Sequence, residues 1–188
     1  FLIVILSRLQ LFTENTLTAV LPVIRRRDPA WFIALGRLWG IVLAANLVGC
    51  FLMATFLATA GTLAAPVEEA VVAISKHLME NTPSEMFLKG IMAGWLIAAL
   101  VWMLPSSEGS EFLVIGLMTY LIALGDFTHV IAGSVEALYL VITGEIGMFK
   151  ATFGFFLPTL AGNVFGGTVL FAVLSYVQVR EELGRVEE

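Results

Sequence analysis

Five long apolar segments separated by short polar stretches dominate the hydrophobic pattern of this 188-residue chain. A bilayer core of roughly 30 Å is crossed by a helix of about 20 apolar residues. Each segment is long enough for one crossing, and we expect the stretches 61–83 and 144–152 to be loops. The predicted spans are 1–24, 31–60, 86–104, 111–143 and 153–177.

The segment 111–143 is too long for one straight crossing. Its 33 residues would measure about 50 Å as a single helix. We expect a break at Gly125–His129 (GDFTH), because glycine destabilises a helix and Asp, Thr and His are costly in lipid. The two half-helices would then point their termini into the bundle, where a helix N-terminus suits a small anion.

A similar polar interruption, Leu11–Thr16, lies in the first apolar segment. The separations from Phe12 to Asn46 and from Phe127 to Asn163 differ by about two residues, and each asparagine is followed by glycine three positions later. Such small-residue motifs favour close helix contact and interhelical hydrogen bonds. Matching polar breaks in two halves of a chain are typical of repeat transporters and point to the transport site.

The composition is that of an integral membrane protein. Hydrophobic residues make up 59% of the chain and charged residues 13%, and the mean hydropathy is +0.95, far from the balance of soluble domains. The net charge of −5 says little about the pore, because most carboxylates lie in loops and the tail. The single cysteine, Cys50, excludes a disulfide within the chain. We expect one membrane transport domain over residues 1–188.

Loop charges predict the orientation. The cluster Arg25–Arg27 follows the first span, and Arg180 and Arg185 follow the last. By the positive-inside rule, we expect the 25–30 loop and the C-terminus to face the cytoplasm in a multi-pass protein of the inner (plasma) membrane.

The repeat also predicts a missing helix. A full span, 86–104, precedes the broken one in the second half, whereas the first half begins inside its broken span. We therefore expect a fragment that holds helices two to six of a six-helix parent.

Several motifs spread over the chain belong together: Leu-Phe-Thr at 11–13, Ala-Asn-Leu-Val-Gly at 45–49, Lys-Gly-Ile-Met-Ala-Gly-Trp-Leu at 89–96, Val-Trp-Met at 101–103, the His129 segment, and Pro-Thr-Leu-Ala-Gly-Asn-Val-Phe-Gly-Gly at 158–167. At these residues the chain resembles the formate/nitrite transporter family, pentameric channels for small monovalent anions and their weak acids. The resemblance implies an all-α polytopic membrane protein, a six-helix inverted-repeat (aquaporin-like) bundle with broken helices two and five. It also implies a small anion substrate and a homo-pentamer in the lipid bilayer.

In that family the Leu-Phe-Thr loop and the His loop meet across the pore, which carries over to Thr13 and His129. The chain departs from the family pattern at four other positions. The family typically has Glu before the His and Asn four residues after it, where this chain has Thr128 and Gly133. Gly94 stands where an Asn is common, and an extra acidic residue, Asp126, lies in the break. These departures indicate a divergent branch.

His129 is the central candidate on its chemistry as well. A lone histidine can be a packed core residue whose ring bonds a backbone carbonyl. In a membrane span, however, an ionisable group is a functional candidate by default. Imidazole changes charge near neutral pH, so we expect His129 to attract an anion as imidazolium and to pass it a proton.

The other pore candidates each have a structural alternative. Thr13 and Thr128 are donors, although a helical threonine often bonds a carbonyl one turn back. Phe12 and Ile122 would narrow the path, or would simply pack against neighbours. Lys89 would draw anions to the mouth, or would extend to the lipid headgroups.

Two alternative functions remain open. One is a proton-coupled monocarboxylate symporter, and the other is a membrane scaffold that conducts nothing. An enzyme is disfavoured, because the chain has no His-Glu-x-x-His, no Gly-x-Ser-x-Gly and only two histidines. We expect no metal or other cofactor, since no ligands cluster at suitable spacing. Nucleic-acid binding is excluded, because the arginine cluster at a membrane edge is a topology signal.

Overall fold

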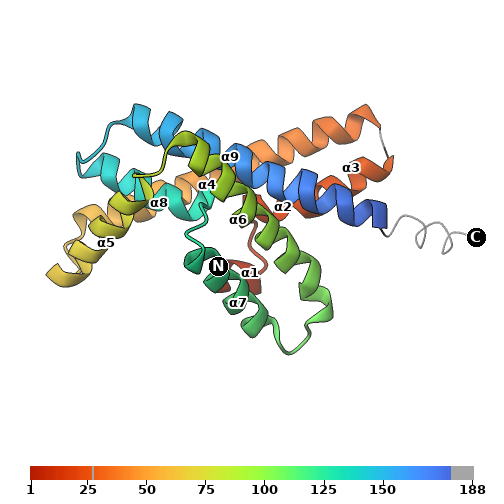
Figure 1. Ribbon diagram of the computed structural model, residues 1–188, viewed down its shortest axis with the longest axis horizontal. Coiled ribbons are helices and arrows are strands. Elements are labelled where there is room, and N and C mark those ends of the chain that lie inside the picture. The colour runs from red at the N-terminus through yellow and green to blue at the C-terminus, as the bar shows by residue number, and fades with distance from the viewer. Residues whose placement is uncertain (27, 179–188) are drawn as a thin grey trace, which may run out of the picture.

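The computed structural model describes residues 1–26 and 28–178, and within them every regular element is a helix. The all-α class predicted from the sequence is therefore confirmed. Figure 1 shows the elements, which are α1 (Leu2–Leu6), α2 (Phe12–Thr18), α3 (Val20–Arg26), α4 (Pro29–Thr59), α5 (Ala65–Leu78), α6 (Pro83–Met103), η1 (Leu104–Ser106), α7 (Glu111–Leu124), α8 (Val130–Ile142), η2 (Lys150–Phe156), α9 (Leu157–Val164) and η3 (Phe165–Val173).

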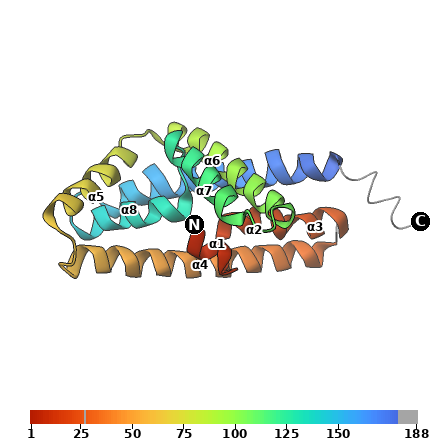
Figure 2. The same ribbon diagram turned by 90° about the horizontal axis from the view of Figure 1, so that it is seen from below.

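Three helical stretches of the described chain are long and apolar enough to cross a membrane: Pro29–Thr59, Pro83–Ser106 and Lys150–Gln178. They coincide with the spans predicted at 31–60, 86–104 and 153–177. The last is helical throughout, with the π-helical stretches η2 and η3 on either side of α9. Figure 2 shows α4 running along the length of the molecule, with α6 and α8 above it.

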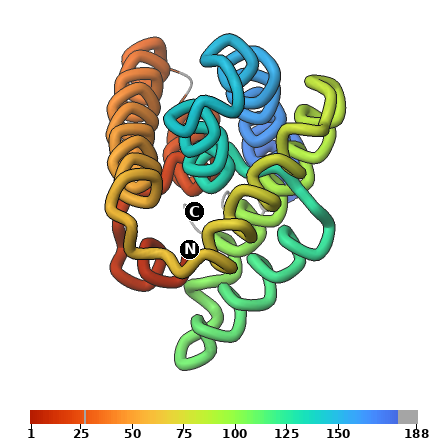
Figure 3. Tube along the Cα trace, turned by 90° about the vertical axis from the view of Figure 1, so that its left-hand side faces the viewer, coloured from red at the N-terminus to blue at the C-terminus, as the bar shows by residue number. Residues whose placement is uncertain are grey.

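The other two predicted spans contain non-helical residues. Within 1–24, α1 ends at Leu6 and α2 begins at Phe12; within 111–143, α7 ends at Leu124 and α8 begins at Val130. We call Ser7–Leu11 the first break and Gly125–His129 the second break. Figure 3 shows the centre of the molecule enclosed between α4 on one side and α6 and α7 on the other.

The stretch 61–83 is not simply a loop, as the sequence analysis expected, because it contains α5. The signals were present in the sequence: Pro66 in the first turn, Glu68 near the positive end and Lys76 near the negative end. Its apolar residues, including Val71 and Val72, pack against the hydrophobic cluster around α8.

The helices α6 and α9 make the most extensive contact in the fold, followed by α4 and α8. A Cβ added at Gly94 would overlap the backbone of Asn163, and one at Gly166 would overlap the carbonyl of Ile91. The close helix contact predicted for the motif at 163–166 is therefore confirmed. The matching prediction for Gly49 is wrong within the described chain, because a Cβ there would meet no atom within 4 Å.

Side-chain hydrogen bonds join α4 to α2 and α8, the helices that follow the two breaks. The thiol of Cys50, which is 5% exposed, donates to the carbonyl of Ile131 over 3.3 Å. The indole Nε1 of Trp39 donates to the carbonyl of Asn15 over 3.0 Å. Since α4 is continuous, it holds α2 and the start of α8 in one fixed relation.

Candidate functional site

At the first break, Asn46 of α4 pairs with backbone groups that have no partner within a helix. The backbone N–H of Phe12 donates to Asn46 Oδ1 over 2.9 Å, and Asn46 Nδ2 donates to the carbonyl of Gln10 over 3.0 Å. Interrupted backbone in an apolar interior persists only when such groups are paired. Asn46 therefore stabilises the end of the first break.

At the second break, Asn163 of α9 makes the same pair of contacts. The backbone N–H of Val130 donates to Asn163 Oδ1 over 2.8 Å, and Asn163 Nδ2 donates to the carbonyl of Thr128 over 3.0 Å. The same Nδ2 also donates to the carbonyl of Gly90 on α6 over 2.9 Å. Asn163 is fully buried, so it joins the break to two helices in the core.

These contacts correct the alignment of the two breaks. Phe12 and Val130 occupy matching positions, 34 and 33 residues before their asparagines, so the sequence-based match of Phe12 with Phe127 is wrong by three positions. Each asparagine pairs with backbone groups, and the presence of a phenylalanine side chain does not indicate which backbone groups these are. In the corrected register, Arg8 and Asp126 also match, and both have left-handed backbone, with φ of 54° and 50°.

Thr13 and His129 meet where the two breaks approach each other. The Oγ1 atom of Thr13 lies 2.8 Å from Nε2 of His129, although 116 positions separate the residues in sequence. Thr13 is fully buried and His129 is 4% exposed. The ring of Phe1 packs edge-on against the imidazole, with 4.9 Å between ring centroids. The structure thus brings together the two residues that the family resemblance paired.

His129 also caps α8. Its Nδ1 atom accepts from the backbone N–H groups of Ile131 over 3.3 Å and Ala132 over 3.2 Å. A ring nitrogen that accepts these bonds carries no proton, so the hydrogen-bond network assigns the proton to Nε2, which donates to Thr13. A cation is also disfavoured at a helix N-terminus. The geometry therefore favours neutral imidazole, rather than the imidazolium that the sequence analysis expected.

A cavity of about 380 Å³ opens at His129 on the side of α5. We call it the α5-side vestibule. Ile122 lies on its wall, 6% exposed, in a position where it can narrow the path to the imidazole. Lining residues used below are His77, Ile122, Asp126, Thr128, His129 and Glu136.

Two other predicted pore residues are occupied by contacts within the fold. The hydroxyl of Thr128 donates to the carbonyl of Met86 over 2.8 Å, which ties the second break to α6. Phe12 packs with Val42 and Val130 and lies edge-on to Trp39, with 5.8 Å between ring centroids. Their roles as a pore donor and as a gate stay predictions.

Lys89 is not a free cation. Its Nζ donates to Asp126 Oδ2 over 2.5 Å and to Asn81 Oδ1 over 2.7 Å. Asp126 lies in the second break, so this ion pair links the break to the start of α6. The sequence offered no signal for the pairing, because 37 positions separate the two residues.

Two of the departures from the family pattern, Gly133 and Gly94, have steric reasons. A Cβ at Gly133 would overlap the ring of Phe155, and one at Gly94 would overlap the backbone of Asn163, so asparagine fits at neither position. Sequence reasoning missed Glu136, which lies seven residues after His129 on the vestibule face of α8. The helical period was the signal that could have found it. Within the part of the chain that the structure describes, no three His, Cys, Asp or Glu residues gather as metal ligands.

Apolar helices long enough to cross a membrane surround a buried polar site at two helix breaks, an arrangement typical of a polytopic membrane protein. The sequence profile of the formate/nitrite transporter family matches residues 1–177, and the chain belongs to this family.

The relatives agree with this assignment. The chain is 48% identical over 183 residues to the inner membrane protein YfdC of Escherichia coli K12, covering 97% of this chain and 59% of YfdC. It is 28% identical over 173 residues to the uncharacterized transporter YwcJ of Bacillus subtilis 168, covering 88% of this chain and 66% of YwcJ. The chain thus spans less than two thirds of the length of these relatives.

The fold also matches a solved structure, a pentameric formate channel with formate bound. The TM-score is 0.77 at 23% sequence identity, over 93% of this chain and 77% of that one. The match confirms the coarser part of the predicted fold, an all-helical chain with the fold of a formate channel.

Proposed function

We propose that this protein forms a membrane channel or transporter for small monovalent anions or their weak acids, such as formate or nitrite. The observation that carries the proposal is the buried contact between Thr13 and His129, 2.8 Å apart, at the meeting point of two helix breaks. Polar side chains are costly at such depth and are retained where a substrate passes. Membership of the formate/nitrite transporter family supports the same conclusion.

The hydrogen-bond network suggests how the site binds an anion. With the proton of His129 on Nε2, the oxygen of Thr13 accepts it, and the Thr13 hydroxyl proton is available to a substrate oxygen. Proton transfer to the substrate requires His129 to take up a second proton at Nδ1. That step opens the bonds from Ile131 and Ala132, so proton delivery and a local rearrangement at the start of α8 are coupled.

The two breaks belong, in this proposal, to helices two and five of an inverted repeat. Helix two comprises α1 to α3, and helix five comprises α7 and α8. The matching asparagine contacts and the matching left-handed residues, Arg8 and Asp126, support this pairing.

Positive-inside topology places Arg25 and Arg26 at the cytoplasmic face and α5 outside. Arg27, Arg180 and Arg185 lie outside the described residues. Reporters fused in the 25–30 loop and after Glu188 should read cytoplasmic, and one inserted at Gly61 should read external. A cytoplasmic reading at Gly61 would refute this orientation.

We further propose a homo-pentamer in which α4 contacts a neighbouring subunit. Gly36, Gly40 and Ala44 recur every four residues along an exposed side of α4, a spacing that suits close packing of membrane helices. The similar solved structure is pentameric. Gly40→Leu should lower the oligomer mass measured by native mass spectrometry, whereas Ala34→Leu, on another exposed side of α4, should not.

Uptake into proteoliposomes tests the function. Labelled formate, nitrite, hydrosulfide, acetate and lactate are supplied across several pH values to vesicles that contain the folded protein. Thr13→Val should reduce uptake, while Thr55→Val, which removes a hydroxyl bonded within α4, should not. Absence of uptake of every anion by folded protein would favour the scaffold. Uptake that stops without a proton gradient would favour the monocarboxylate symporter.

A further inference from the structure

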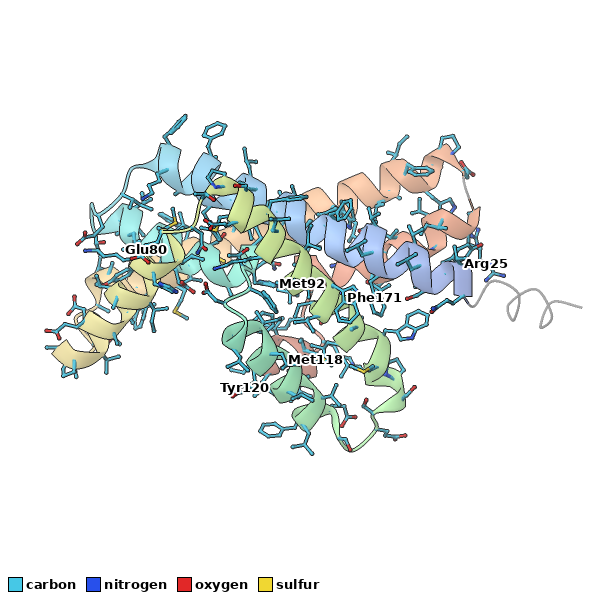
Figure 4. The ribbon with its side chains drawn as sticks, viewed as in Figure 1. Arg25, Glu80, Met92, Met118, Tyr120 and Phe171 are labelled. Carbon is cyan, nitrogen blue, oxygen red and sulfur yellow. The ribbon has the colours of Figure 1, made fainter. Side chains whose placement is uncertain are left out.

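The α5-side vestibule carries an unusual set of charges for the mouth of an anion pore. Asp126 and Glu136 both line it. Glu80 lies at its edge, where its carboxylate is 3.1 Å from Nδ1 of His77, and Figure 4 shows Glu80 on the same side of the molecule as α5. Among the described side chains, Lys89 is the permanent cation that contacts one of these carboxylates, and it is paired with Asp126.

Asp126 removes the charge that would attract anions. Its Oδ2 atom accepts the 2.5 Å bond from Lys89 and lies 3.7 Å from Nε2 of His77. The Lys89 ammonium therefore faces a carboxylate at contact distance, and an approaching anion meets the pair and not an isolated cation. Among the described residues, no ion pair or side-chain hydrogen bond of Glu136 is present, and its side chain lines the vestibule together with Asp126.

The backbone alone does not explain an acidic residue at this position. Asp126 has a left-handed backbone, with φ of 50°, and aspartate tolerates that region. The matching residue of the first break, however, is Arg8, with φ of 54°. Arg8 lines a separate cavity with Ile5 and Glu111 at the opposite end of α6. Because the same conformation accommodates a cation in one break, the negative charge in the other is a separate property.

We propose that Asp126 and Glu136 are specificity-determining residues that exclude free anions from the α5-side vestibule and favour the neutral acid form of the substrate. The inference rests on the proposed transport function. A full negative charge is repelled in a confined mouth with low-dielectric walls, whereas an uncharged acid is not. The selected substrate class at this mouth is therefore the protonated small weak acid.

The test compares an anion that has no neutral form with a weak acid. Proteoliposomes that contain the folded full chain are given nitrate or thiocyanate at neutral pH, and formic acid at acidic pH. Asp126→Asn keeps the size and the tolerance for left-handed backbone but removes the charge. We expect nitrate and thiocyanate uptake to rise about fivefold or more, with formic acid uptake within about twofold of the wild type.

Further variants keep the result decisive. Glu136→Gln leaves the Lys89 ion pair intact and should raise nitrate uptake on its own, so it decides the matter even if Asp126→Asn folds poorly. In Asp126→Asn with Lys89→Met, the increase should be smaller, because the freed cation is absent. Glu68→Gln, on the exposed side of α5, is the matched control and should change nothing.

The outcomes separate this inference from the function on which it rests. If Glu136→Gln and Asp126→Asn both give the same ratio of nitrate to formic acid uptake as Glu68→Gln, the vestibule charges do not set specificity. If wild-type vesicles take up neither nitrate nor formic acid while the protein is folded, the transport function itself is wrong.

Discussion

In both breaks an asparagine pairs with backbone groups that have no partner within a helix, but the second break is held more firmly than the first. Asn163 is fully buried, makes three hydrogen bonds and touches α6 as well as the second break. Asn46 is only partly buried, and Ser7–Gln10 beside it are exposed. Local opening is easiest where few buried contacts oppose it. The second break therefore belongs to the rigid core, and the first is the softer partner.

This difference in firmness gives His129 and Thr13 separate roles. His129 is held by the rigid break and by its bonds to the start of α8. Thr13 lies in the first turn of α2, directly after the softer break. We expect movements that open or close the path at the Thr13–His129 contact to arise in the first break.

Asn163→Ala should have the largest effect on stability. The change leaves one donor and two acceptors without partners in the core, and each buried unpaired group costs about 1–3 kcal/mol. We expect a loss of about 3 kcal/mol or more, seen as a large fall in the yield of folded protein on size-exclusion chromatography. A yield equal to that of Asn46→Ala would contradict the proposed difference between the breaks.

Gly94→Ala should have the second-largest effect on stability. Its Cβ would overlap the backbone of Asn163, and such overpacking costs about 1–3 kcal/mol. The matched change Gly49→Ala places a methyl group in open space and should leave the thermal unfolding midpoint in detergent unchanged or slightly higher. Equal shifts in the two variants would show that α6 and α9 can separate freely.

His129→Asn should change the pH dependence of transport with little change in fold. Asparagine is a good N-cap, so α8 should still begin at residue 130, but the titrating ring is gone. We expect uptake, divided by the concentration of the permeating form of the acid, to vary by less than about twofold between about pH 5 and 8. Thr13→Val should lower uptake by about three- to tenfold, as expected for one hydrogen bond, and keep the pH profile. An unchanged profile in His129→Asn would make His129 a packing residue.

Asn46→Ala should lower stability much less than Asn163→Ala does. Asn46 is only partly buried and Gln10 is exposed, whereas Asn163 is fully buried, so less buried polar surface loses its partner and we expect a loss of about 1 kcal/mol. Transport should respond more than the unfolding midpoint, because the softer break leads directly into the turn of α2 that holds Thr13. If the midpoint falls while uptake stays normal, the first break is merely structural.

The long helices could be predicted because their signal is local. The segments 31–60, 86–104 and 153–177 each show a continuous apolar run, and hydropathy alone identifies them. The pairing of Thr13 with His129 came from the family resemblance, because no local pattern connects residues 116 positions apart. α5 was missed because its amphipathic pattern is short and lies between polar stretches.

The remaining features depend on backbone atoms and on packing. The register of the breaks is set by the backbone N–H groups of residues 12 and 130. Nearly every residue type has such a group, so matching the two phenylalanines gave the wrong alignment. The neutral state of His129 follows from two N–H groups of α8. The ion pair of Lys89 with Asp126 requires the start of α6 and the second break to meet, which only the tertiary structure shows.

The reactivity of the Cys50 thiol can measure how often the contact between α4 and α8 opens. Cys50 is the only cysteine of the chain, and its bond to the carbonyl of Ile131 covers it with the first turn of α8. A thiol reagent can reach it only when α4 and α8 part. When the contact between α4 and α8 closes faster than the reagent reacts, the labelling rate of Cys50 divided by that of a free thiol equals the fraction of time that the contact is open. Labelling with and without substrate therefore measures whether transport loosens the support of the second break.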